Sequence, residues 1–380
     1  MKVCIVAGEA SGDLHAAAVV RNLRELDPTL EAFGFGGDLL VTEGVRILHH
    51  VRELGIVGLS NVIRHLGMFR RVFRELLDEI RSERPDVIVL VDYPDFNLRL
   101  ARAVKPLGIP VVYFISPQVW AWRRGRVHAI ARTVDHMLVL FPFEQEFYEN
   151  HGVPVTYVGH PLVEQLEGVR RPRGLPAAER PLRVALLPGS RKMEIESLFP
   201  AMLDAVEELR KSRDTEAFLI KAPTIDSASV RSMIEARGSD VRIVPHDGGR
   251  TLATADLAIS SSGTATLEAA VIGVPVIVMY RLNRSTFALA RLLVKVPHFS
   301  LVNIIAGRKI VPELIQSDVS GEKIAATAQA LLAPERYLEV LSELERVRDL
   351  LGEKGSSMRA AEKIYRLVRE RNQGSPASES

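Results

Sequence analysis

The sequence is poor in cysteine, in long apolar runs and in net charge. Cys4 is the only cysteine among 380 residues, which excludes a disulfide within the chain, and its apolar surroundings predict a small core residue. No apolar run approaches the roughly 20 residues of a membrane-spanning helix. The chain passes from Met1 almost directly into a predicted strand, so we expect no signal peptide. A net charge of +2 does not favour a nucleic-acid partner. These absences predict a soluble or peripheral cytoplasmic protein.

The GxGxxG fingerprint of dinucleotide-binding folds is also absent, although glycine loops follow several predicted strands. Apolar strands alternate with helical patterns in both halves, and the strand at 86–91 is apolar enough for a parallel sheet covered on both faces. Arg, Pro, Gly and Glu accumulate at 164–182, which indicates a linker. We predict an α/β fold of two Rossmann-like domains facing a cleft. The predicted parts are domains at 1–165 and 183–345, a linker at 166–182, a C-terminal helical segment at 346–371 and a disordered tail at 372–380.

A glycine turn at mid-chain has the layout of an anion-binding loop. Pro188 ends an apolar strand, Gly189 and Ser190 form a turn, and a helical pattern with Glu194 in its first turn follows. Backbone N–H groups and the positive end of a helix dipole meet at such a turn. Arg191 adds a fork that can bind two phosphate oxygens. On these residues alone, a diphosphate site and a plain turn with a surface arginine are equally good interpretations.

A second loop of this kind lies in the same half. Ser262, Gly263 and Thr264 stand between a predicted strand and a helix, so further N–H groups are free there. Glu268 lies one turn into the helix, and helical side chains lean toward the N-terminus, so its carboxylate can accept hydrogen bonds from ribose hydroxyls. The alternative is a capped helix with a solvated glutamate, but the first loop in the same half favours a nucleotide.

The first half carries acidic residues at its strand ends. The loop after the first strand contains Gly8, Glu9, Ser11, Gly12 and Asp13, and its two carboxylates suit sugar hydroxyls better than phosphate. Ser11 or Asp13 can at the same time cap the following helix.

A second acidic group follows the strand at 86–91. Asp92, Asp95 and Asn97 stand at the end of a parallel strand where ligands of open α/β sheets bind. The two aspartates are general-base candidates. A metal site is less well supported because no further hard ligands are evident, so we expect neither a metal nor a cofactor.

The tryptophan pair and one asparagine each have two interpretations. Trp120 and Trp122, beside Arg123, form either a surface for a sugar or acyl chain or a packed loop anchor. Asn303, within an apolar run, either binds a ligand or caps a turn.

The helical pattern at 61–82 has one apolar stripe and a basic remainder. A helix that packs its stripe on the core is the plainer interpretation, and a surface that meets anionic lipid is the alternative. The arginines around the stripe are Arg64, Arg70, Arg71, Arg74 and Arg81.

The chain has two α/β halves. One half carries loops suited to phosphate and ribose, and the other carries carboxylates and aromatic residues. This combination suits a nucleotide-sugar enzyme of the GT-B arrangement. The order of the motifs strengthens this hypothesis, because from residue 1 to about 370 the chain closely resembles the lipid-A-disaccharide synthase family. The motifs that carry the resemblance are GEASGD at 8–13, DYPDFN at 92–97, SPQVWAWR at 116–123, LPGSR at 187–191, SGTATLE at 262–268 and VNIIAGR at 302–308. Tyr93 departs from the family pattern, which has a small residue there, and is expected to reshape the acceptor site.

The resemblance implies an inverting glycosyltransferase that joins UDP-2,3-diacylglucosamine to 2,3-diacylglucosamine 1-phosphate and releases UDP. It further implies a β-1,6 linkage, action at the cytoplasmic face of the inner membrane and a homodimer. On this hypothesis the first domain binds the acceptor, the second binds the UDP-sugar, and the C-terminal segment packs back on the first domain. An alternative is another GT-B sugar-nucleotide enzyme, such as a UDP-N-acetylglucosamine 2-epimerase. A sugar-nucleotide binding protein without activity is a third possibility.

Inversion requires a base for the acceptor hydroxyl and stabilisation of the leaving diphosphate. We assign the base to Asp92, with Glu9, Asp13 and Asp95 as alternatives. Arg191 and the two glycine loops are expected to hold the diphosphate, and Glu268 the ribose.

Overall fold

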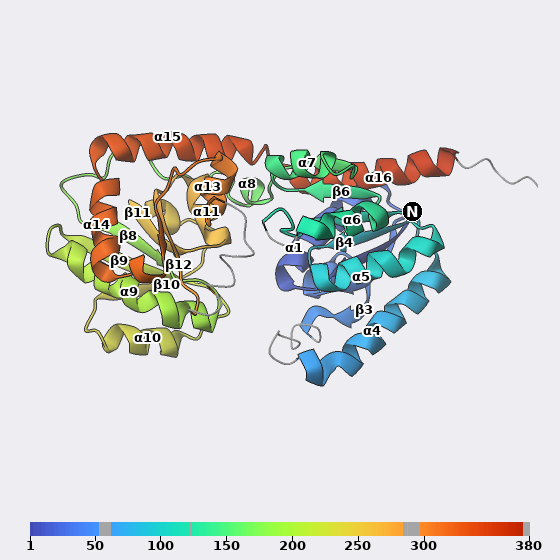
Figure 1. The fold of residues 1–380 in the computed structure, drawn as a ribbon, viewed down its shortest axis with the longest axis horizontal. Coiled ribbons are helices and arrows are strands. Elements are labelled where there is room, and N and C mark those ends of the chain that lie inside the picture. The colour runs from blue at the N-terminus through green and yellow to red at the C-terminus, as the bar shows by residue number, and fades with distance from the viewer. Residues whose placement is uncertain (53–61, 122–123, 284–286, 288–296, 375–380) are drawn as a thin grey trace, which may run out of the picture. The chain divides into compact units, whose positions relative to one another are not determined.

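The computed structural model describes residues 1–52, 62–121, 124–283, 287 and 297–374. It consists of two compact α/β units, each a parallel sheet with helices packed against it (Figure 1). Unit 1 comprises residues 1–161 and the chain from 353 onward, and unit 2 comprises residues 162–352.

Unit 1 is built on a seven-stranded sheet in the order β3-β2-β1-β4-β5-β6-β7, with every pairing parallel. The strands are β1 (Lys2–Ala7), β2 (Glu31–Gly36), β3 (Arg46–His50), β4 (Val87–Val91), β5 (Val111–Phe114), β6 (His136–Val139) and β7 (Val155–Tyr157). The helices are α1 (Ala10–Leu26), α2 (Asp38–Thr42), α4 (Val62–Glu83), α5 (Pro94–Val104), α6 (Val127–Thr133), α7 (Pro142–Glu149) and α16 (Ser356–Gly374). Strand order reverses between β1 and β4, which creates a topological switch point at their carboxyl ends.

Apolar side chains cover both faces of this sheet because successive residues of a strand point to opposite sides. In β1, Cys4 and Val6 join the core cluster formed with α4, α5 and α6, while Val3 and Ile5 are buried on the other face. Cys4 is fully buried, which confirms the predicted core role.

The C-terminal helix α16 packs against α1 (Figure 1). Arg359 of this helix donates from Nε to the backbone oxygen of Val158 at 2.8 Å, so the helix is tied to the end of the β7 strand. The chain returns to unit 1 at residue 353 rather than at the predicted 346, because α15 continues to Leu350 within unit 2.

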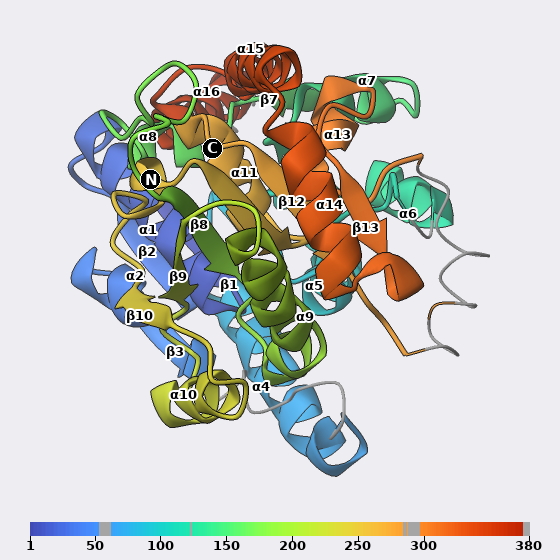
Figure 2. The same cartoon turned by 90° about the vertical axis from the view of Figure 1, so that its left-hand side faces the viewer.

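Unit 2 is built on a six-stranded sheet in the order β10-β9-β8-β11-β12-β13, again parallel throughout. The strands are β8 (Leu182–Leu187), β9 (Thr215–Lys221), β10 (Val241–Pro245), β11 (Leu257–Ser261), β12 (Val276–Tyr280) and β13 (Glu313–Ile315). The helices are α8 (Leu162–Gln165), α9 (Lys192–Arg210), α10 (Ser227–Glu235), α11 (Thr264–Ile272), α13 (Leu301–Ala306), α14 (Gly321–Leu331) and α15 (Pro334–Leu350). Figure 2 shows α9 and α14 side by side on one face of the sheet. The switch point of this unit lies between β8 and β11.

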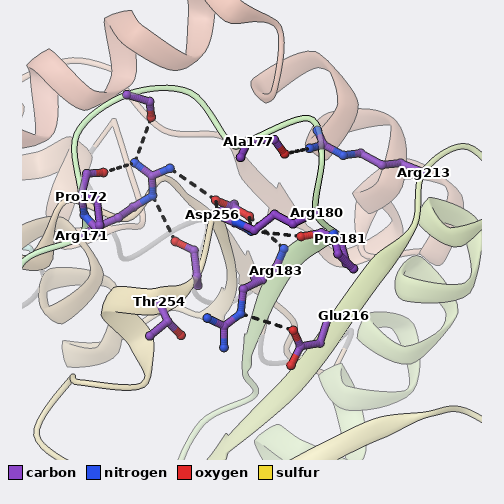
Figure 3. A network of polar contacts seen from close by, with 12 residues as sticks. Arg171, Pro172, Ala177, Arg180, Pro181, Arg183, Arg213, Glu216, Thr254 and Asp256 are labelled. Atoms are coloured by element: carbon purple, nitrogen blue, oxygen red, sulfur yellow. Dashed lines mark hydrogen bonds and ion pairs between the residues drawn. The ribbon is translucent and has the colours of Figure 1, made fainter.

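The segment 166–182, predicted as a linker, is instead an ordered part of unit 2. Figure 3 shows Arg171 and Arg180 of this segment reaching Asp256, which lies just before β11. Arg180 binds the carboxylate in bidentate fashion at 2.7 and 2.8 Å, and the Arg183 backbone N–H donates to it at 2.9 Å. Asp256 is almost fully buried, so this network fixes the segment to the sheet.

Candidate functional site

The switch point of unit 1 holds Asp92. The residues after β1 and β4 are neighbours there because the two strands pair directly. Asp92 and Tyr93 both adopt left-handed backbone conformations, with φ of 47° and 48°, which is uncommon outside glycine. The turn is held by its own backbone oxygen: Asp92 O accepts hydrogen bonds from Tyr113 OH at 2.5 Å and from Asn97 Nδ2 at 2.7 Å. The fold therefore fixes the strained turn that carries the aspartate.

The environment of the Asp92 carboxyl suits proton transfer. Burial, and next the negative charge of Glu9, raise its pKa from 3.8 to about 6, while a hydrogen bond from the Tyr93 backbone acts in the opposite direction. A carboxylate with a pKa near neutrality is an effective general base. Glu9 is exposed at the first turn of α1 and makes no capping bond with its side chain.

Tyr93 shapes the floor of this site. Its ring lies against Gly8, so that a Cβ atom at Gly8 would stand 2.2 Å from the ring. Only glycine therefore fits at position 8 while Tyr93 keeps this orientation. The same ring stacks on Phe96 with centroids 5.8 Å apart, which anchors it to the core.

Asp13 is placed as a structural residue. It is buried, and its carboxylate accepts hydrogen bonds from the backbone N–H groups of Gly37 at 2.6 Å, Leu39 at 3.1 Å and Leu40 at 3.3 Å. It thus holds the first turn of α2, whereas the predicted capping role was for α1, whose N-cap residue is Glu9. Ser11 is exposed and Gly12 is buried on α1. Its carboxylate oxygens are engaged by these three backbone N–H groups and are turned toward α2, so the geometry does not favour the alternative assignment of the base to Asp13.

Asp95 and Asn97 differ in their availability. Asp95 is exposed and pairs with Arg126 at 2.7 Å. Asn97 is fully buried and donates to the backbone oxygens of Asp92 and of Val91. Asn97 therefore positions the Asp92 turn.

Trp120 is a packed anchor, the second of its two predicted interpretations. It is buried, its Nε1 donates to Glu144 Oε1 at 3.1 Å, and its ring meets Phe143 edge-on with centroids 4.9 Å apart. Burial raises the pKa of Glu144 to about 7. Trp122 and Arg123 lie outside the described residues.

The switch point of unit 2 brings the two predicted glycine loops together. Gly189 has φ of 112°, and a Cβ atom there would stand 2.3 Å from Glu194 Oε2 and 3.1 Å from Ser261 Oγ. Glu194 Oε2 accepts from the Ser190 N–H at 3.3 Å, and Glu194 Oε1 meets Arg191 Nη1 at 3.2 Å. A carboxylate thus occupies the anion position of the loop, and the Arg191 side chain, although paired with it, is 83% exposed.

The neighbouring loop starts α11. Gly263 is its N-cap residue and makes no side-chain cap, so the N–H groups of the first turn, beginning at Thr264, have no capping side chain. Ser262 Oγ donates to the backbone oxygen of Phe299 at 3.0 Å, which leaves its hydroxyl engaged.

Glu268 is not the solvated glutamate of the alternative interpretation. Its side chain is only 12% exposed, and its Oε1 lies 2.9 Å from His246 Nε2. The hydrogen bond to Glu268 raises the pKa of His246. His246 follows β10 directly and was missed by sequence reasoning, since no motif surrounds it.

The Asn303 side chain cross-links backbone and side-chain groups within unit 2. Its Nδ2 donates to Val311 O and to Glu313 Oε1, each at 2.9 Å, and its Oδ1 accepts from the N–H groups of Ile310 and Val311. Every polar atom of this buried side chain is satisfied internally, which supports the structural interpretation over ligand binding.

The described residues form neither a metal site nor a membrane-spanning helix. Within the described residues, no group of three or more His, Cys, Asp or Glu side chains has the arrangement of a metal site. No helix in the described part of the chain is long and apolar enough to cross a membrane.

Two Rossmann-like units, each with its polar loops at a topological switch point, define the GT-B class of glycosyltransferases and related sugar-nucleotide enzymes. A family model described as lipid-A-disaccharide synthetase matches residues 3–364. The lipid-A-disaccharide synthase of Anaeromyxobacter dehalogenans (strain 2CP-C) is 43% identical over 376 residues, which covers 97% of this chain and 98% of that relative. The chain belongs to the lipid-A-disaccharide synthase family and is a glycosyltransferase of lipid A biosynthesis. The predicted family and enzyme class are thereby confirmed.

Solved structures confirm the predicted fold class. The UDP-GlcNAc 2-epimerase from Neisseria meningitidis bound to UDP-GlcNAc matches with a TM-score of 0.63 at 14% identity, over 96% of this chain and 100% of that chain. The calicheamicin glycosyltransferase CalG4 matches with a TM-score of 0.61 at 15% identity, over 99% of both chains. At such identities the likeness shows the shared fold alone.

Proposed function

We propose that this enzyme joins UDP-2,3-diacylglucosamine to 2,3-diacylglucosamine 1-phosphate by a single inverting displacement, giving a β-1,6-linked disaccharide 1-phosphate and UDP. Membership of the family supports this reaction. The observation that carries the mechanism is the Asp92 carboxylate at the switch point of unit 1, held on a strained turn with its pKa raised to about 6.

In the proposed mechanism Asp92 takes the proton of the acceptor 6-hydroxyl as that oxygen attacks the anomeric carbon. The bond to the UDP oxygen breaks on the opposite face, so the configuration inverts. Burial, and next the negative charge of Glu9, raise the pKa of Asp92 and so strengthen it as a base. Asp95, exposed and paired with Arg126, is the alternative base.

Unit 2 is proposed to bind the donor. Arg191 and the N–H groups of Gly189 and Ser190 stabilise the charge that develops on the diphosphate, once Glu194 gives up its place on the loop. The first-turn N–H groups of α11 add to this stabilisation, beginning at Thr264. Glu268, oriented by His246, accepts hydrogen bonds from the ribose. Charge stabilisation by arginine and helix ends requires no metal.

The decisive test is UDP release by the purified chain with both diacyl substrates together and with each alone. The proposal expects UDP and disaccharide only when both are present. The main alternative is a UDP-N-acetylglucosamine 2-epimerase, an activity borne by one of the structures that share the fold. Conversion of UDP-N-acetylglucosamine alone to its 2-epimer, without disaccharide formation, would favour that alternative.

We also propose that α4 attracts the enzyme to anionic membrane. In the described part of this helix, Val72, Leu76 and Ile80 are buried in the core, so the apolar stripe follows the core interpretation. The basic face remains: Arg70 and Arg74 are exposed and have no ion pair with any described residue. The side chains of residues 62–66, including Arg64, lie outside the description. Anionic lipid attracts each such arginine by about 1 kcal/mol.

Vesicle sedimentation tests this surface. Binding should rise with anionic lipid, fall with salt and weaken in the Arg74→Glu variant, while Arg231→Glu on α10, the same charge change elsewhere, serves as the control. Equal binding of all three proteins would contradict the proposal. Because the chain belongs to this family, the proposal also includes action at the cytoplasmic face of the inner membrane and assembly into a homodimer. Light scattering of the purified chain tests the dimer.

A further inference from the structure

Unit 2 contains a basic pocket away from its switch point. The pocket has a volume of about 200 Å³ and lies between the segment 170–173, the C-terminal end of α11 at 270–273 and one face of α15. Because α11 starts at the carboxyl end of β11 and runs back along the sheet, its last turn lies toward the opposite edge of the sheet from the glycine loops. The pocket is therefore separate from the proposed donor site.

The walls carry four arginines and one carboxylate. The charged lining residues are Arg170, Arg171, Arg173, Arg348 and Glu345. Arg173 and Glu345 form an exposed ion pair at 2.8 Å. Arg171 forms an ion pair with Asp256, as Figure 3 shows.

Arg171 gives the pocket a rigid frame. Its guanidinium donates to the backbone oxygens of Ala255, Pro172 and Gly174, and it stacks over the Tyr337 ring at 5.3 Å. Its backbone N–H donates to Ile272 O at 3.0 Å, which joins the segment to the end of α11. The two walls are therefore fixed before any ligand arrives.

The two remaining arginines have no acidic partner among the residues that the structure describes. Arg170 donates from its guanidinium to the backbone oxygens of Val169 at 2.7 Å and Leu166 at 3.4 Å. The side chain of Arg348, which is half-buried on α15, has neither a hydrogen bond nor an ion pair with the residues the structure describes. Burial, and next the charge of Arg348, lower the pKa of Arg170, which places the two positive groups close enough to repel each other. Two neighbouring guanidiniums without a carboxylate are suited to an anion with several acceptor oxygens.

We propose that this pocket is a second, non-catalytic site that binds a phosphate group between Arg170 and Arg348. Val271, Ile272 and Leu341 supply an apolar lining beside the two charges, so the phosphate fits as part of a larger molecule. Two sources share this chemistry: a soluble phosphate compound and the headgroup of an anionic phospholipid. The site does not depend on the proposed sugar transfer.

The test uses the full-length chain carrying Arg191→Ala, so that phosphate binding at the glycine loop is weakened, and dependence on Arg348 identifies binding at the pocket. Inorganic phosphate and pyrophosphate are titrated at constant ionic strength, with the thermal midpoint and chemical shifts as readouts. Arg348→Glu should weaken binding by about one to two orders of magnitude, the effect of losing a charged hydrogen-bond partner. Arg231→Glu, the same charge change on an exposed helix of the same unit, should leave it unchanged. Arg348→Gln repeats the test if the glutamate variant unfolds.

Vesicles of phosphatidylcholine with and without phosphatidylglycerol distinguish the two sources. Binding of phosphate or pyrophosphate that depends on Arg348 assigns the pocket to a soluble compound. Vesicle binding that depends on Arg348, with no response to the soluble anions, assigns it to a lipid headgroup. Equal responses of the Arg348 variants and the Arg231 control in both arms, or no binding in either, would overturn the proposal.

Discussion

Replacing Glu9 by glutamine should make the enzyme more active in acid. Asp92 has a pKa of about 6, against 3.8 for the free side chain, and burial contributes more to this rise than Glu9 does. If Asp92 is the base, it is about nine-tenths ionised near pH 7 and about one-tenth near pH 5, so kcat/KM should fall along an acid limb centred near 6. Glu9→Gln removes one of the two causes and keeps the burial. The midpoint of the limb should therefore move to a value between 3.8 and about 6.

The assay is UDP release with both diacyl substrates, measured as kcat/KM from about pH 4.5 to 8. Asp92→Asn should lower turnover by about two to four orders of magnitude and abolish the limb. Asp95→Asn is the control, because Asp95 is not among the groups that shift the pKa of Asp92. A limb that stays near 6 in Glu9→Gln, or near-normal turnover in Asp92→Asn, would refute the assignment of the base.

Three other predictions follow from the contacts described. Arg191→Ala should cost about 3 kcal/mol of transition-state stabilisation, seen as loss of kcat, while Lys192→Ala, next to it and equally exposed, should not. The hydrogen bond to Glu268 raises the pKa of His246, so UDP affinity, measured by calorimetry, should be highest below that pKa and should fall as the pH rises through it. The His246→Gln variant keeps a donor that does not titrate, and it should remove this pH dependence. Burial raises the pKa of Glu144 from 4.5 to about 7, so its favourable contribution is complete below 4.5 and is lost as the pH rises through 7. Glu144→Gln should therefore gain stability relative to wild type over that interval in urea denaturation, and a constant difference would contradict this reasoning.

The central strands of both sheets could be predicted because they are buried on both faces and hence apolar throughout. The edge strands β3 and β13 escaped prediction. Residues of β3 are at most half-buried, and β13 has only three residues, so neither has a continuous apolar run. Register and strand order come from long-range pairing, which no local pattern contains.

The gathering of the proposed catalytic loops was predictable for a related reason. In a parallel sheet the carboxyl ends of all strands meet at one edge, so loops that follow β1 and β4, or β8 and β11, gather without further information. The roles of Asp13, Glu144 and His246 were not predictable, because each depends on partners at least 22 residues away. The sequence around Asn97 and Asn303 is compatible with ligand binding, but in the structure both side chains form hydrogen bonds with neighbouring backbone groups.

Unit 2 is inserted into unit 1, since the chain leaves unit 1 at residue 161 and returns to it at 353. On the ribosome, α16 is synthesised after all of unit 2. The face of α1 that packs against α16 therefore stays uncovered until that point. Unit 2 is continuous and can fold first, whereas unit 1 can close only once translation has passed its last helix. A fragment cut at the boundary after residue 161 would expose that face permanently. The two halves of the enzyme are thus unequal in expression experiments: unit 2 is separable as one stretch of chain, and unit 1 is not.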